Sequence, residues 1–278
     1  MRVGYVGLGS MGGDQARLLA KSPFDFMVYD VSATALAAFE GKAKIAGSLA
    51  ELGRDRDVIS ICVRDDQQVR DVLEGAGRLL DSMIKGSIVL VHSTVKPETI
   101  VDLAGKAARR GVTLIDAPVT RTVMQSGGQF VFTMTGGAEA VTERVRPILE
   151  VYSTDVVHVG PLGSAMVLKI SNNLVAWVEL LVGRQAFTLA MAGGVPLDKL
   201  AQVMKRNGNL TPTMEAAFVD GPRRFTGSPA DRAAFMDSQG RIGEKDLELA
   251  ISLGDSVGVA VPTAIHAKEF VRKAMVGQ

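Results

Sequence analysis

The segment Gly163–Asn173 (GSAMVLKISNN) places one lysine in a mainly apolar run. At helical spacing Lys169 and Asn173 share one face, and Asn172 lies close to it. A lysine buried in such a run loses hydration, which lowers its pKa toward the range of a general acid/base. The run therefore predicts a proton-transferring Lys169. The alternative interpretation is a lysine that extends from an apolar helix into solvent, with both asparagines exposed.

A second polar group, Thr120-Arg121-Thr122, follows the apolar run Thr113–Asp116, in what we expect to be a loop after a strand. In open α/β sheets ligands bind at the carboxyl ends of the strands. Arg121 offers a planar fork of donors that suits an oxyanion. The group predicts a site for an acidic substrate end, and the alternative for Arg121 is an exposed loop arginine.

A glycine motif, Gly7-Leu8-Gly9-Ser10-Met11-Gly12, follows the apolar strand at residues 3–8 and precedes a helical segment. In this context the pattern is typical of dinucleotide binding. Gly7 permits the tight turn, Gly9 lets the backbone approach the pyrophosphate, and Gly12 lets the helix pack on the sheet. The N–H groups and dipole of the helix then hold the phosphates.

Asp30 ends the second predicted strand, at about the distance expected from the glycine motif. Its carboxylate can accept both ribose hydroxyls and would repel a 2′-phosphate, and no Arg or Lys follows it directly. Asp30 therefore favours NAD over NADP. The alternative is a residue of a turn at the strand end.

Three further parts of the chain contain candidates for the cofactor site. Val63-Arg64 and Ser93-Thr94 end strands of the same predicted sheet, where ligands bind. Ser93–Pro97 can equally cap the helix that Pro97 begins. Taken by itself, Lys245 marks an ordinary charged helix start.

The histidines and the cysteine predict no chemistry. His92, His158 and His266 show neither triad nor metal-ligand spacing, so we expect all three to be structural and expect no metal site. Cys62 is the one cysteine and cannot form an intrachain disulfide, which favours a reducing, cytoplasmic compartment.

Alternating strand and helix patterns in the first half predict a doubly wound parallel α/β sheet that positions these strand-end residues. After Gly160-Pro161 only helical patterns follow, at 165–191, 197–207, 244–257 and 263–275. We therefore expect a dinucleotide-binding domain at 1–162 and an all-helical domain at 163–278. The segment 212–240 is rich in Pro, Gly, Arg and Asp and is expected to be loop with short helical turns.

The composition limits the possible partners. The 278 residues carry a formal net charge of +1, with no basic run or acidic tail, so nothing favours nucleic acid or an anionic membrane. The most apolar stretch, 164–192, contains Lys169, Glu179 and Arg184, which makes it a poor membrane span.

Five ordered motifs resemble the β-hydroxyacid dehydrogenase family, which includes 3-hydroxyisobutyrate and tartronate semialdehyde dehydrogenases. They are Gly7–Gly12, Ser93–Pro97, Asp116–Val119, Gly163–Asn173 and Lys245–Leu247. The resemblance covers nearly the whole chain. It implies an N-terminal Rossmann domain and an all-helical C-terminal domain, joined by a long interdomain helix. It also implies a homodimer or homotetramer whose subunits pair through the helical domains.

The resemblance also implies roles for single residues. Lys169 would be the catalytic lysine, and Asn173 would orient the substrate. Lys245 would approach the nicotinamide or its ribose, and Thr94 would lie beside that ribose. Val63 and Arg64 would lie along the cofactor.

The sequence departs from the family at the substrate loop. Where the family commonly has Ser-Gly-Gly after Pro-Val, this chain has Thr120-Arg121-Thr122. The Arg-Thr pair resembles the branch of sulfolactaldehyde reductase and 4-hydroxybutyrate dehydrogenase, although Thr120 stands where that branch has glycine. The acidic end of the substrate can therefore be a carboxylate or a sulfonate.

Together these residues predict NAD-dependent oxidation of a small β-hydroxy acid, or reduction of its semialdehyde, with Lys169 as the general acid/base. The first alternative is a semialdehyde reductase of the sulfolactaldehyde or 4-hydroxybutyrate type, or an imine reductase-like enzyme. Typical imine reductases usually lack the lysine, and Asp30 argues against NADPH-linked semialdehyde reductases. A non-catalytic NAD(H)-binding protein is the alternative from another class.

Overall fold

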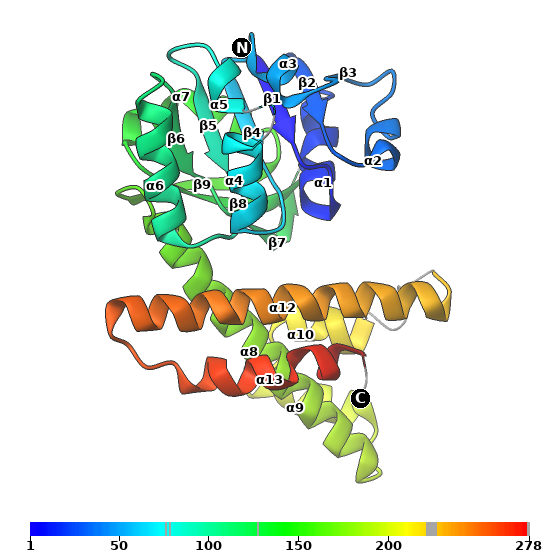
Figure 1. Ribbon diagram of the computed structural model, residues 1–278. Coiled ribbons are helices and arrows are strands. Elements are labelled where there is room, and N and C mark those ends of the chain that lie inside the picture. Colours follow the sequence, from blue (N-terminus) through cyan, green and yellow to red (C-terminus); the bar gives the residue numbers. More distant parts are fainter. Residues whose placement is uncertain (76, 78, 127, 221–226, 277–278) are drawn as a thin grey trace. The chain divides into compact units, whose positions relative to one another are not determined.

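The computed structural model describes residues 1–278 except 76, 78, 127, 221–226 and 277–278. The chain forms two compact units, Met1–Lys169 and Ile170–Gln278, which Figure 1 shows in blue to green and in green to red. This division falls within the helix that carries Lys169. The domain boundary expected after residue 162 stays a prediction.

The first unit alternates strands and helices, as the sequence predicts. Its elements are β1 (Arg2–Val6), α1 (Ser10–Leu19), β2 (Asp25–Tyr29), α2 (Ala33–Ala37), β3 (Lys44–Ile45), α3 (Leu49–Gly53), β4 (Val58–Ile61), α4 (Asp66–Glu74), α5 (Leu79–Ser82), β5 (Ile88–Val91), α6 (Pro97–Ala108), β6 (Thr113–Asp116), β7 (Val119–Ser126), β8 (Gln129–Gly136), α7 (Glu139–Leu149) and β9 (Ser153–Gly160).

These strands form one nine-stranded sheet in the order β3-β2-β1-β4-β5-β6-β8-β7, with β9 paired to β8. Strands β1 to β6 are parallel, whereas β8 is antiparallel to both β6 and β7. The parallel part confirms the doubly wound Rossmann-like fold expected from the sequence. Because its strands share one direction, their carboxyl ends meet at one edge and bring the strand-end residues together there.

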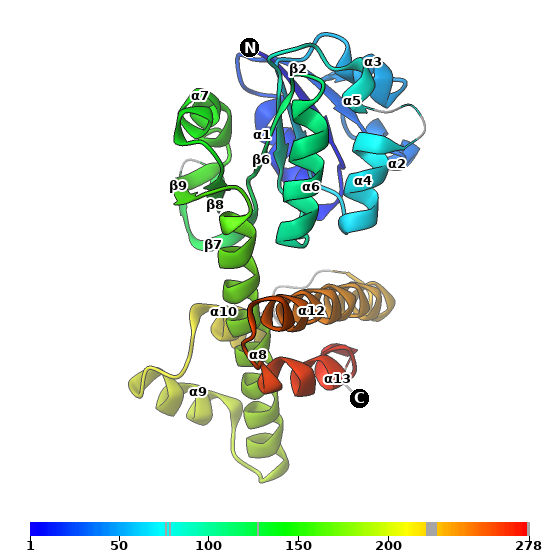
Figure 2. The same cartoon turned by 60° about the vertical axis from the view of Figure 1, so that its left-hand side comes forward.

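Helices cover both faces of this sheet, so its central strands are apolar on both sides. One core cluster joins the sheet to α1, α2 and α7, and includes Tyr5, Leu19 and Ile148. The other joins it to α3, α4, α5 and α6, and includes Leu73 and Leu103. In Figure 2, α4 and α6 lie side by side on that second face, where Arg70 pairs with Asp102.

The second unit is helical, as expected. Its elements are α8 (Ser164–Ala192, which begins in the first unit), α9 (Leu197–Arg206), α10 (Pro212–Met214), a π-helical turn η1 (Glu215–Asp220), α12 (Pro229–Val257) and α13 (Pro262–Val276). Apolar residues of α8, α12 and α13 form its core, among them Trp177, Leu247 and Val271. Helices α12 and α13 run side by side in Figure 1.

Helix α8 is long and apolar enough to cross a membrane by length and composition alone. Core helices of globular domains meet the same two criteria, so this is weak evidence for a span. Its residues Ile170, Trp177 and Leu181 instead belong to the core of the second unit.

Three sequence-based expectations about elements were wrong. Residues 120–122, expected to lie in a loop, are part of β7, because antiparallel pairing with β8 overrides weak local preference. The helical pattern at residues 67–80 predicts one helix, but the chain breaks at Gly75 and forms α4 and α5 instead. Helix α12 begins at Pro229, inside the segment expected to be loop, while residues 221–226 of that segment lie outside the described part. The start of α12 follows from a capping box between Ser228 and Asp231 with Pro at the first helical position.

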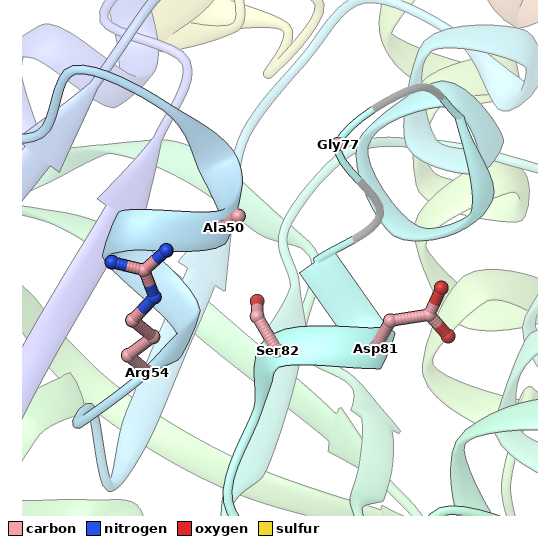
Figure 3. A pocket seen from close by; sticks show the side chains of 5 residues that line it. All are labelled: Ala50, Arg54, Gly77, Asp81 and Ser82. Carbon is pink, nitrogen blue, oxygen red and sulfur yellow. The ribbon is translucent and has the colours of Figure 1, made fainter.

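A surface hollow of about 480 Å³ is lined by Ala50, Arg54, Gly77, Asp81 and Ser82 (Figure 3). It lies between α3 and α5, which lead into the amino-terminal ends of β4 and β5. The hollow is therefore at the sheet edge opposite the one where a dinucleotide binds, and we assign no role to it.

A buried polar group surrounds His92 at the end of β5. Its Nδ1 lies 2.6 Å from the carbonyl oxygen of Ala117, and its Nε2 lies 3.3 Å from the hydroxyl of Tyr152. Tyr5 stacks on its ring. A neutral imidazole with its proton on Nδ1 satisfies both hydrogen bonds, because Nε2 then accepts from Tyr152. Burial lowers the pKa of His92 to about 4.

This buried histidine predicts acid sensitivity. The folded pKa lies below the ordinary value of 6.5, so the unfolded chain binds the proton first as pH falls. The free energy of unfolding therefore has its full value, as far as His92 is concerned, above pH 6.5. It falls by about 3 kcal/mol as the pH decreases toward 4. We expect His92→Phe to reduce the fall in unfolding free energy between pH 7 and pH 4.5, measured by urea denaturation. The matched control is His266→Phe at an exposed position. Parallel pH curves for wild type and His92→Phe would contradict the prediction.

Candidate active site

The glycine motif forms a tight turn between β1 and α1. Gly7 has a φ of +93°, and a Cβ there would lie 2.2 Å from the carbonyl oxygen of Cys62. A Cβ on Gly12 would lie 2.1 Å from the carbonyl oxygen of Gly7, whereas one on Gly9 would meet nothing within 4 Å. Gly7 and Gly12 thus serve the turn and the packing, and Gly9 leaves space in front of the backbone.

This turn fits a dinucleotide. Gly9 is the N-cap of α1 and supplies no side-chain acceptor to the first helical turn. The first N–H groups of a helix have no acceptor within the helix, so those of Ser10 and Met11 suit a pyrophosphate. Ser10 is exposed, Met11 half-buried and Leu8 buried.

Asp30 lies directly beside the same turn. One carboxylate oxygen accepts a hydrogen bond from the backbone N–H of Leu8 at 2.6 Å, and the other accepts from Ser32 N–H at 2.7 Å. Each oxygen keeps a further lone pair, so the carboxylate both fixes the glycine turn and can accept from a ribose.

The ends of β4 and β5 are tied together at the same edge. Ser93 Oγ accepts from the backbone N–H of Val63 at 2.8 Å, and Gln68 accepts from Arg64 N–H at 3.0 Å. Thr94 is half-buried beside them in the sequence. Val63, Arg64 and Thr94 therefore lie at the carboxyl edge, where the sequence placed them.

Lys169 and Asn173 lie one helical turn apart on α8, and both are buried, at 7% and 8% exposure. Asn172 is exposed instead. Lys169 is thus buried and does not extend from the helix into solvent. Its role in proton transfer stays a prediction.

The side chain of Asn173 is held by Asp246 of α12. Asn173 Nδ2 donates to Asp246 Oδ2 at 2.7 Å, and Trp177 Nε1 donates to the same oxygen at 3.1 Å. Lys245 Nζ lies 2.9 Å from the other oxygen, Oδ1. Because Asn173 donates to a carboxylate, its amide orientation is fixed, with Oδ1 directed away from Asp246.

Strand β7 separates the predicted substrate residues. Thr120 pairs with Phe132 and Arg121 with Val131, so the side chains of Thr120 and Arg121 point to opposite faces of the strand. The register of β7 shifts after Arg121. The guanidinium of Arg121 lies 5.0 Å from the ring centre of Phe130 and pairs with Asp14 of α1 at 2.6 Å. Thr120 and Arg121 therefore do not share one face of β7.

The sequence motifs did not indicate the roles of Asp246, Trp177 and Asp14. Trp177 follows Asn173 by one helical turn, a spacing that could have suggested a shared partner. Asp246 and Asp14 gain their roles only from contacts with other elements. Within the described residues, no group of three or more His, Cys, Asp and Glu side chains could hold a metal ion.

Comparisons with known proteins agree with this geometry. Residues 2–160 match the family described as the NAD binding domain of 6-phosphogluconate dehydrogenase. The chain is 31% identical over 258 residues, 92% of this chain and 80% of the relative, to a probable mitochondrial 3-hydroxyisobutyrate dehydrogenase of Dictyostelium discoideum. The chain belongs to the β-hydroxyacid dehydrogenase family. It is thus an oxidoreductase with an NAD(P)-binding domain.

Two solved structures extend the similarity to the whole fold. A 3-hydroxyisobutyrate dehydrogenase from Salmonella typhimurium is 25% identical, with a TM-score of 0.83 over 100% of this chain and 99% of that one. Psf3, solved in complex with NADP+ and 2-OPP, is 26% identical, with a TM-score of 0.82 over 98% and 93% of the two chains.

The Asp246 contacts give a spectroscopic prediction, because Trp177 is the one tryptophan of the chain. We expect Asp246→Ala to shift the emission maximum of Trp177, since its indole N–H loses a carboxylate acceptor. With Asn173 released, turnover should fall about tenfold or more, because small misplacements in an active site are costly. Steady-state kinetics and fluorescence of the same sample measure both effects.

The matched control is Glu248→Ala, which removes an exposed carboxylate of α12 that pairs with Lys268. It should change neither emission nor turnover. Wild-type turnover in Asp246→Ala with a shifted emission would contradict a positioning role for Asp246.

Proposed function

We propose that this protein interconverts a small β-hydroxy acid and its carbonyl partner with NAD, and that Lys169 transfers the proton. The observation that carries the proposal is a buried lysine one helical turn from an asparagine whose amide is fixed by Asp246. An ordinary surface helix would not bury this pair at the cost of its hydration.

In the oxidative direction neutral Lys169 accepts the proton of the substrate hydroxyl, and in the reductive direction its ammonium form returns it. Asn173 keeps one N–H for the reacting oxygen, because its other N–H is directed to Asp246. The bound nicotinamide supplies the hydride acceptor or donor. The protein's contribution is proton transfer and orientation of the reacting carbon.

We propose NAD as the cofactor because of Asp30. Its charge lies at the end of β2, held by the N–H groups of Leu8 and Ser32, and opposes a 2′-phosphate. The residues that follow, Val31 and Ser32, bring no cation. Psf3, a protein of similar fold, was solved with NADP+. Any assay should therefore compare NAD with NADP.

For the acidic end of the substrate we propose Arg121 as the cation. The hydroxyls of Thr120 and Thr122 and the amide of Asn172 remain the other predicted substrate contacts. Arg121 is half-exposed, and exposed ion pairs such as its pair with Asp14 contribute only about 0–1 kcal/mol. A substrate acid can therefore compete with Asp14 for the guanidinium. This cation favours a second candidate function, a reductase of sulfonate or longer-chain semialdehydes.

We also propose a cytoplasmic homo-oligomer. Leu168, Val175, Val182 and Leu189 recur every seven residues along α8 and are 42%, 55%, 57% and 76% exposed. Such a line of apolar side chains suits a helix of a second subunit. The single thiol, Cys62, whose pKa burial raises to about 11, suits a reducing compartment.

Lys169→Ala tests the proton-transfer assignment. We expect kcat to fall about 10²–10⁴-fold, because a general acid/base contributes that much. The Kd for NADH, from fluorescence titration, should change less than about threefold, because binding of the dinucleotide depends on the glycine turn and Asp30. Lys199→Ala, at an exposed position of α9, is the control. Retained turnover in Lys169→Ala would overturn the assignment, and NADH binding by wild type without any turnover would favour a non-catalytic protein.

The substrate class is tested by a screen with NAD+ and NADP+ over 3-hydroxyisobutyrate, glycerate, serine, 4-hydroxybutyrate and dihydroxypropanesulfonate. For the best substrate we expect Arg121→Gly to raise KM about tenfold, because a charge-assisted pair is lost. Asp14→Asn should lower KM or leave it unchanged, since it removes the competitor for Arg121. An equal rise in KM for both variants would mean that Arg121 only ties β7 to α1.

A further inference from the structure

Asp116 ends β6 and is fully buried, yet its carboxylate contacts a segment far along the chain. Oδ1 accepts a hydrogen bond from the backbone N–H of Gly163 at 2.9 Å, and Oδ2 accepts from Met166 N–H at 3.0 Å. These are the N–H groups at the start of α8. The carboxylate therefore caps the helix that carries Lys169.

The first residue of α8 does not cap the helix with its own side chain. Ser164 begins α8, but its buried Oγ makes no hydrogen bond within the described part of the chain. Gly136 leaves room for the carboxylate, because a Cβ there would lie 2.4 Å from Asp116 Oδ1. The start of α8 is thus set by the position of β6 in the sheet.

The same segment also positions the predicted substrate strand. His92 Nδ1 lies within hydrogen-bond distance of the carbonyl oxygen of Ala117, and Val119 then begins β7, which carries Thr120. Asp116 is one residue from Ala117 and bonds Met166, one helical turn before Lys169. The proton-transferring residue and the substrate strand are therefore both fixed from one corner of the sheet.

We infer that Asp116 is a positioning residue for Lys169, acting through its hydrogen bonds to the first turn of α8 and through its negative charge. This inference rests on the proposed function of Lys169 in proton transfer. Lys169 follows Met166 by three residues, about 4.5 Å along a helix axis. A carboxylate at this helix start offsets the positive end of the helix dipole and favours the ammonium form of Lys169.

Two opposing effects act on the ionisation of Asp116. Burial raises the pKa of its carboxyl group, and the N–H groups of Gly163 and Met166 act against burial by stabilising the carboxylate. Two backbone donors directed at the two oxygens are the arrangement that holds a buried carboxylate in place.

Asp116→Asn tests the inference, with Asp116→Ser as a second variant that keeps one oxygen acceptor without charge. For the best substrate of the screen, we expect kcat to fall about 10- to 100-fold through misplacement of Lys169. The limb of the pH–rate profile that Lys169 sets should move to lower pH by roughly 0.3–1 unit, through loss of the nearby charge. The Kd for NADH should stay within about twofold of wild type, because the glycine turn is not part of this contact.

Asp57→Asn is the matched control. Asp57 accepts from the backbone N–H of Arg2 at 2.8 Å at the opposite edge of the sheet, so the same chemical change is made away from α8. It should leave kcat and the pH profile unchanged. Circular dichroism first shows which variants are folded. The kcat values and pH profiles of the folded variants are then compared at 25 °C.

The outcomes separate the two proposals. If Lys169→Ala is inactive but folded Asp116→Asn has wild-type kcat and pH profile, only the role of Asp116 is overturned. If Lys169→Ala is active, the proposed function fails, and the role of Asp116 fails with it. If neither Asp116 variant folds, or if both lose NADH binding as much as turnover, Asp116 serves the fold alone and the inference is overturned.

Discussion

The hydrogen bonds to the Asp116 carboxylate hold the start of α8 at the sheet of the first unit. The carboxylate stands at the end of β6, in the parallel sheet, and accepts from Gly163 and Met166. A buried carboxylate is costly unless donors surround it, so this contact tolerates little displacement. The position of the first turn of α8 within the first unit depends on it.

A second buried carboxylate, that of Asp246, holds two side chains farther along α8. Asp246 accepts from Asn173 and Trp177 through one oxygen and lies beside Lys245 through the other. An asparagine alone on a helix can rotate and can exchange its amide oxygen and nitrogen. Fixed by a carboxylate, it presents one defined donor and one defined acceptor.

The turn formed by the glycine motif, Gly7–Gly12, depends on close contacts between backbone segments rather than on side chains. At Gly7 and Gly12 a Cβ would lie within about 2.2 Å of a carbonyl oxygen, so no other residue fits without rearrangement of the turn. Asp30 then holds the turn through Leu8 while keeping lone pairs for a ribose. The glycine motif and the acidic strand end therefore form one structural unit, in which the carboxylate holds the turn.

The sequence alone determined the doubly wound sheet, the helical second half, the dinucleotide turn and the family, because each depends on local periodicity or on a motif that is contiguous in the chain. It also indicated Lys169 and Asn173, since helical spacing places them on one face. The sequence did not predict β7, whose pairing with β8 arises between segments, and so it did not indicate that Thr120 and Arg121 point to opposite faces. Only the tertiary structure decided that Arg121 pairs with Asp14, that Asp246 holds Asn173, and that Asp116 caps α8 from a distant strand. The reason is physical: a hydrogen bond between residues far apart in the chain leaves no periodic trace in either segment, and only folding brings donor and acceptor together.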